Sequence, residues 1–152
     1  MKKAFHTLAA MAAILLTSLG QAADVAILNG DVSLTITTAA AGQQPPAVTD
    51  ETGQLEWTTL VTDAVKKIVT QTNLAGPSYT LSVRAVSISA GDGTGAGAVA
   101  LSTTPADLVV DIPSGIQPLD PGTCTLRYAA SATVTGGAGT DNHSVTFTIT
   151  DQ

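Results

Sequence analysis

Alternating apolar and polar positions recur along this chain and predict β-strands. In residues 32–38, VSLTITT, the side chains of Val32, Leu34 and Ile36 share one face, and serine and threonine occupy the other. A period of two is typical of a strand with one buried face, because successive side chains point to opposite sides of the sheet. The same alternation recurs in residues 78–88, SYTLSVRAVSI, which predicts a second half-buried strand.

The longest alternating stretches lie in the last third of the chain. Residues 123–135 place apolar side chains on even positions, and residues 142–150 place them on odd positions. The glycine-rich segment between them, residues 136–141, is typical of a turn. The pattern therefore predicts a long β-hairpin that closes the domain. A further short strand is predicted in residues 97–103, GAVALST, after a glycine-rich turn.

Three other segments carry weaker patterns. Residues 61–72 combine helical spacing with β-branched side chains, so helix and strand both stay open, and we favour a strand over residues 65–72. Residues 41–54 are polar and contain two prolines, which predicts a loop. In residues 103–113, Thr104 stands three residues before Asp107, an arrangement typical of a helix start, which predicts a single helical turn.

About seven short strands separated by glycine and proline turns predict an all-β protein, an immunoglobulin-like β-sandwich, with a closed β-barrel as the alternative. Residues 1–23 combine Lys2 and Lys3 with a short apolar run and small residues at the end, the layout of a secretory signal peptide. Residues 24–152 then form a single domain. We expect the mature protein in the periplasm, at the cell surface or outside the cell.

Charge and cysteine content restrict the partners. Loss of the predicted leader leaves four basic residues against twelve acidic ones, a net charge of −8. So acidic a chain is a poor ligand for the phosphates of nucleic acid, and no apolar stretch is long enough for stable membrane insertion after cleavage. Cys124 is the only cysteine, so no intrachain disulfide can form, and its apolar strand face predicts burial.

Asp141, His143 and Ser144 are the residue types of a nucleophilic triad. Strand alternation places His143 and Ser144 on opposite faces, which separates the hydroxyl from the imidazole that would activate it. The predicted hairpin also places Cys124 about 30 Å from His143. We therefore expect no catalytic residues and no enzyme activity, with His143 at the end of the core face.

Two aromatic residues are the main candidates for contact with a ligand. The glycine-rich residues 90–98 contain only one carboxylate, and Asp50 with Glu51 lack a third ligand, so we expect no metal and no cofactor. Trp57 and Tyr79, with Tyr128 as a third ring, would suit a platform that stacks on sugar rings if they are exposed, but a chain this poor in aromatics favours burial of Trp57 in the core.

The segments LEWTT, KKIVTQTN and the C-terminal CTLRYAASATVTGGAGTDNHSVTFTIT, in this order, resemble secreted bacterial β-sandwich proteins of the surface-coat and fimbrial type. Fimbrial subunits often carry a glycine about fourteen residues from the C-terminus and an aromatic residue next to last. Gly139 matches the first position, whereas Asp151 departs from the second and the paired cysteines are missing. No functional residue is carried over from this resemblance.

These features predict an exported, non-enzymatic structural or surface subunit that associates with itself or with other surface components through strand edges. The candidate assembly strand contains Val32, Leu34 and Ile36, because the segment from Asp24 to Thr38 is followed by a proline-containing loop and can be displaced. The alternative is a periplasmic or secreted module that binds carbohydrate or protein through Trp57 and Tyr79.

Overall fold

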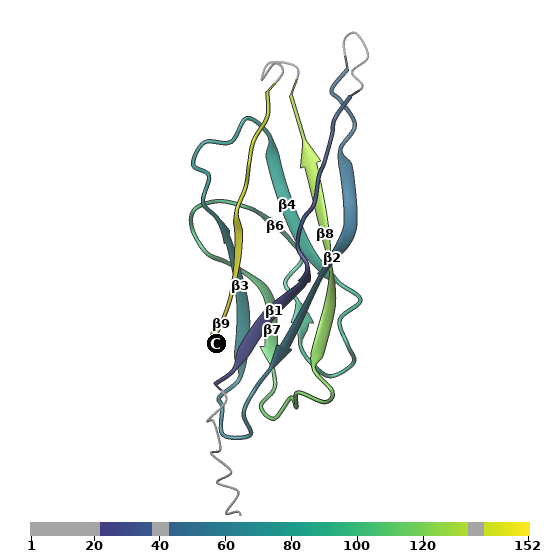
Figure 1. Ribbon diagram of the computed structural model, residues 1–152. Coiled ribbons are helices and arrows are strands. Elements are labelled where there is room, and N and C mark those ends of the chain that lie inside the picture. Colours follow the sequence, from purple (N-terminus) through teal and green to yellow (C-terminus); the bar gives the residue numbers. More distant parts are fainter. Residues whose placement is uncertain (1–21, 38–42, 134–138) are drawn as a thin grey trace, which may run out of the picture.

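The computed structural model describes residues 22–37, 43–133 and 139–152. These residues form an all-β sandwich of nine strands in two antiparallel sheets, without any helix (Figure 1). Accordingly, nothing in the described ranges is a helix able to cross a membrane. The predicted all-β sandwich is confirmed, and two very short strands raise the number above the seven expected. Nearly all of the predicted signal peptide lies outside the described residues.

The two sheets differ in size and share no strand. The larger sheet contains, in spatial order, β1 (Asp24–Asn29), β2 (Val48–Thr58), β8 (Gly122–Ser131), β4 (Thr80–Val86) and β6 (Ala98–Ala100). The smaller sheet contains β5 (Thr94–Gly95), β7 (Ala106–Ile112), β3 (Lys66–Thr72) and β9 (Val145–Asp151). The first and last strands of the chain, β1 and β9, are therefore edge strands of different sheets.

The predicted C-terminal hairpin is wrong. Strand β8 pairs with β2 on one side and with β4 on the other, while β9 pairs with β3 in the opposite sheet. Both edges of β8 are occupied, so β9 has no free edge to pair with there and crosses to the other sheet. The hairpin-based separation of Cys124 from His143 therefore does not apply to this fold.

Two other local predictions are also wrong. Residues 48–54, expected in a loop, belong to β2, whose polar start pairs with β8 before a register shift between Asp50 and Gly53. The predicted helical turn is strand β7, in which Ala106 and Asp107 pair with β3. In both cases pairing with a neighbouring strand overrides the local signal. The strand favoured over residues 65–72 is confirmed as β3.

Trp57 is the largest side chain of the core, and its ring lies against a residue that has no side chain. Trp57 of β2 pairs with Gly122 of β8, and a Cβ atom added to Gly122 would lie 2.3 Å from the indole nitrogen. The indole is 1% exposed, and its N–H donates to the carbonyl oxygen of Asp92 at 3.2 Å. Glycine at position 122 therefore creates the space that the ring occupies.

The N-terminal segment leaves the sheet before its alternating stretch begins. Strand β1 pairs with β2 up to Asn29, with a register shift between Ile27 and Asn29, and residues 31–37 lie outside any strand. Burial still alternates there, because Val32, Leu34 and Ile36 are half-buried between exposed neighbours. Residues 32–37 therefore do not form the predicted strand, although their side chains alternate as expected. Thr38, the last residue of that prediction, lies outside the described residues.

Substitution of Gly122 by alanine tests the packing around Trp57. The new methyl group overlaps the indole, so the free energy of unfolding should fall by about 1–3 kcal/mol, as for other overpacked cores. Gly139→Ala is the control, because its added Cβ atom meets no atom closer than 3.6 Å. Urea denaturation of both variants gives the two values. Equal stability of the two variants would contradict this account of the core.

Candidate functional site

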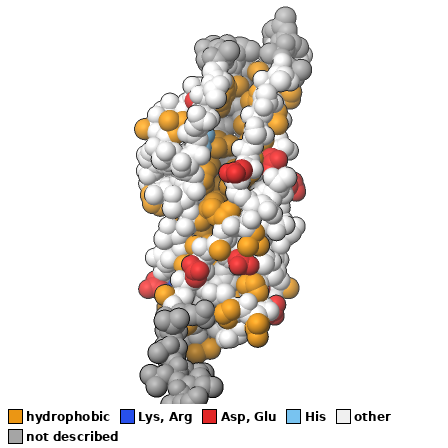
Figure 2. Space-filling view, viewed as in Figure 1, with side chains coloured by type: hydrophobic (Ala, Val, Ile, Leu, Met, Phe, Trp, Pro, Cys, Tyr) orange, Lys and Arg blue, Asp and Glu red, His pale blue; other side chains and the backbone are white. Residues whose placement is uncertain are grey.

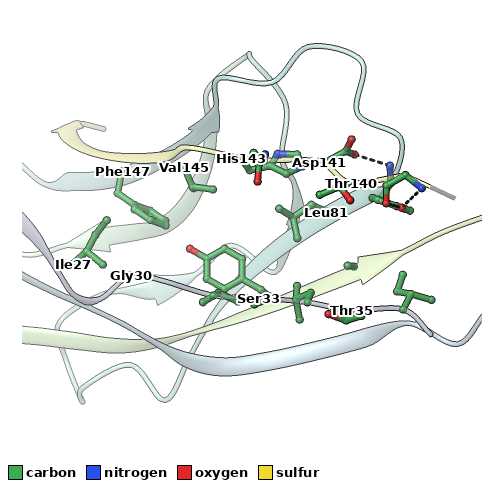
Figure 3. A pocket seen from close by; sticks show the side chains of 18 residues that line it. Ile27, Gly30, Ser33, Thr35, Leu81, Thr140, Asp141, His143, Val145 and Phe147 are labelled. Carbon is green, nitrogen blue, oxygen red and sulfur yellow. Dashed lines mark hydrogen bonds between the residues drawn. The ribbon is translucent and has the colours of Figure 1, made fainter. Parts of the chain in front are cut away.

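A cleft of about 490 Å³ lies between the N-terminal segment and the C-terminal strand, on the face shown in Figure 2. Figure 3 shows one wall formed by the segment that carries Gly30, Ser33 and Thr35, and the opposite wall formed by the segment that carries His143 and Phe147. Side chains of β4 and β8 also line the cleft. Because β1 and β9 border different sheets, the cleft opens between two sheet edges.

The inner surface of the cleft is mainly apolar. Three half-buried side chains of the N-terminal segment, Val32, Leu34 and Ile36, line it, and the first two pack against the core. In Figure 3 the side chains of Val145 and Phe147 point from the C-terminal strand toward this segment. Hydrophobic side chains accordingly appear along the middle of this face in Figure 2. The candidate assembly residues therefore form one wall of the cleft.

One end of the cleft is polar and tightly hydrogen-bonded. The Asp141 carboxylate accepts the backbone N–H groups of Ser78 at 2.7 Å and Tyr79 at 3.1 Å. The Tyr79 hydroxyl accepts the N–H of Gly139 at 2.8 Å and donates to the carbonyl oxygen of the same residue. These bonds fix residues 139–141 against the start of β4.

The triad-like residues near Asp141 are held apart by other partners. His143 Nδ1 is hydrogen-bonded to the Thr72 hydroxyl at 3.0 Å, while the exposed Ser144 donates its backbone N–H to the Asn73 side chain at 2.8 Å. His143 and Asp141 line the cleft, whereas Ser144 does not. The arrangement therefore does not place the Ser144 hydroxyl against the imidazole.

Tyr128, which the sequence offered only as a possible sugar-stacking ring, is a lining residue of the cleft. It is 7% exposed, lines the cleft, and its hydroxyl has no hydrogen-bond partner among the described residues. The only side-chain polar atom that is completely buried without a partner in those residues is Thr70 Oγ1, so the Tyr128 hydroxyl stays accessible from the cleft. Burial, with a smaller contribution from Cys124, raises the pKa of Tyr128 to about 12. The hydroxyl is therefore a hydrogen-bond donor at neutral pH.

The other candidates from the sequence lie away from the cleft or are engaged elsewhere. Trp57 is buried and offers no ring face to a ligand, while Tyr79 lines the polar end with its hydroxyl bonded to Gly139. Cys124 is 3% exposed and does not line the cleft, and burial raises the pKa of its thiol to about 11.

The carboxylates considered as metal ligands are also bonded locally. Asp50 accepts the backbone N–H of Thr52 at 2.8 Å and its hydroxyl at 2.6 Å, bonds that lower the pKa of Asp50. Glu51 pairs with Arg127, and the Asp92 carboxylate accepts the Ser89 hydroxyl. Across the described ranges, no group of three or more acidic, histidine or cysteine side chains is placed to hold a metal ion.

Comparisons with protein-family models, with curated proteins and with solved structures find no match to this chain. A function therefore has to be argued from the geometry of the cleft and of the sheet edges.

The raised pKa values predict a loss of stability at alkaline pH. The folded protein holds the protons of Cys124 and Tyr128 up to about pH 11 and about pH 12, whereas ordinary values are 9.0 and 10.0. The unfolded chain therefore loses them first. The free energy of unfolding should be fully retained below pH 9 and fall above it, by at most about 1.4 kcal/mol per pH unit for each group.

Urea denaturation under reducing conditions at pH 7, 9 and 10 measures this decline. The Cys124→Ala variant should be less stable than the unaltered protein at every pH. Between pH 9 and pH 10 its free energy of unfolding should fall less, because the variant lacks the thiol that titrates in this range. Identical slopes in the two proteins would show that the thiol is not protected by burial.

Proposed function

We propose that the protein is an exported, non-enzymatic structural subunit of the cell surface or extracellular material, and that copies associate through exposed strand edges. Export is supported by the leader-like residues 1–23. The proposal rests mainly on residues 31–37. Their apolar side chains are anchored in the cleft, while their backbone belongs to no sheet.

The backbone of this segment is available for pairing. No N–H or C=O group of residues 31–37 is hydrogen-bonded to another described residue, although the segment is extended along the cleft and lies just beyond the edge strand β1. A row of unpaired backbone groups held in place by alternating side chains is a template for a further strand. The anchored Val32, Leu34 and Ile36 would also define the register of that pairing.

The segment lacks the features that usually protect an edge. Natural edge strands are often blocked by lysine or proline, whereas residues 31–37, DVSLTIT, contain neither and carry one charge, on Asp31. The C-terminal wall of the cleft also ends at an open strand edge. Among the described strands, β9 pairs only with β3. Pairing between an edge of one copy and a different edge of the next is head-to-tail, so it extends into filaments unless the rotation closes a ring.

The carbohydrate-binding alternative has less support. A platform that stacks on sugar rings needs accessible aromatic faces, and of the two candidates Trp57 is buried in the core. Tyr79 alone is half-buried at the polar end of the cleft, so the described residues do not combine the two rings into one platform.

Replacement of Thr35 by proline tests the edge pairing. Proline removes one backbone donor, and the Thr35 N–H is not used within the described part of the subunit, so the variant should fold with stability close to that of the parent. The association constant should fall at least tenfold, equivalent to about 1.4 kcal/mol. Sedimentation velocity over a range of concentrations, with electron microscopy of concentrated samples, measures association of the chain from Asp24 onward.

Thr35→Val is the matched control, because it keeps the backbone N–H and a β-branched side chain at the same position. This variant should associate like the parent. A parent protein that stays monomeric at every concentration, or a proline variant that assembles as well as the valine variant, would contradict the proposal.

A further inference from the structure

We infer that the interior of the cleft is a binding site for a neutral amphiphile, a medium-length aliphatic chain that carries an uncharged oxygen able to accept a hydrogen bond. The proposed site is the space between the two walls of the cleft and not the outer backbone edge of residues 31–37. It therefore does not depend on the association proposed above.

Shape and surface favour an aliphatic occupant. The volume of about 490 Å³ lies in the range of roughly 300–1,000 Å³ that is usual for small-molecule sites. Leu34 and Ile36 on one wall and Val145 and Phe147 on the other are only half-buried, so apolar surface faces the cleft from both sides. An apolar chain between them would remove this surface from water, which is favourable in proportion to the area covered.

The charges around the cleft select against an anionic head group. No lysine or arginine is among the described residues that line it, whereas Asp141 is. Two backbone N–H groups already donate to the Asp141 carboxylate. A carboxylate or phosphate in the cleft would face this charge without a basic partner, and its desolvation would be uncompensated. A neutral oxygen avoids both penalties.

The Tyr128 hydroxyl identifies where that oxygen would bind. It is a protonated donor on a side chain that is more than nine-tenths buried, and no described residue accepts its hydrogen bond. Because this hydroxyl is accessible from the cleft, it can donate a hydrogen bond to an acceptor that enters there. His143 lines the same cleft, and within the described ranges only its Nδ1 has a hydrogen-bond partner.

Nuclear magnetic resonance titration with three probes of equal chain length tests the inference: decan-1-ol, decanoate and decylamine. Decan-1-ol should bind saturably and shift amide signals of residues that line the cleft, and it should bind more tightly than the two charged probes. Tyr128→Phe removes the donor and keeps the ring, so its affinity for decan-1-ol should fall three- to tenfold.

Thr70→Val is the matched control, because the hydroxyl it removes is also without a partner among the described residues but does not line the cleft. Its affinity for decan-1-ol should stay within twofold of that of the parent.

Four results would overturn the inference. Absence of saturable shifts would exclude the site, and tighter binding of decanoate or decylamine would exclude a neutral head group. Unchanged affinity in a folded Tyr128→Phe variant would exclude the proposed donor. Displacement of the alcohol by a synthetic peptide of residues 24–37 that binds more tightly would show that the cleft receives a strand instead.

Discussion

The space between the two sheets has to be filled by side chains, and this chain has few that are large enough. Sheets that pack face to face lie about 10 Å apart, while aromatic residues make up 3% of the sequence. The single tryptophan fills one region, where its indole lies against Gly122. Gly53 lies beside the ring of Tyr128, and Tyr128 and Ala130 both line the cleft.

The borders of the cleft are fixed even though its interior is open. At the far end of β9, Lys66 pairs with Asp151 at 2.6 Å, and the backbone N–H of Gln152 bonds to the carbonyl oxygen of Val65 at 3.0 Å. At the near end, Asp141 is bonded to backbone groups at the start of β4. An occupant would therefore meet a C-terminal wall that is already in position, which lowers the ordering cost of binding.

Local patterns were better at predicting which residues form strands than at predicting which strands pair with one another. Alternation identified the inward face of β8, including Cys124, Leu126 and Tyr128, because the orientation of side chains along a strand is a local property. The hairpin prediction was wrong because partner choice depends on β2 and β4, which occupy both edges of β8. Strand β7 was missed for a related reason, since its pairing with β3 overrides a helix-start signal.

For the same reason, the cleft could not be predicted from the sequence. Val32, Leu34 and Ile36 could be recognised as one apolar face, and Tyr79 as a candidate for ligand contact. Their meeting with His143 depends on the crossing of the C-terminal strand to the opposite sheet, which no local pattern in residues 123–150 indicates. The exposure of the Tyr128 hydroxyl to the cleft likewise depends on which residues surround it in space.

Residues 31–37 are held by their side chains, while their backbone is not paired with any other described residue. Hydrogen–deuterium exchange of the dilute protein tests this claim most directly, because backbone amides exchange slowly only when hydrogen-bonded or sealed from water. The amides of residues 31–37 should exchange quickly, whereas those of β1 that pair with β2 should be protected. Equal protection of the two segments in the monomer would show that residues 31–37 belong to a sheet, and would contradict the account.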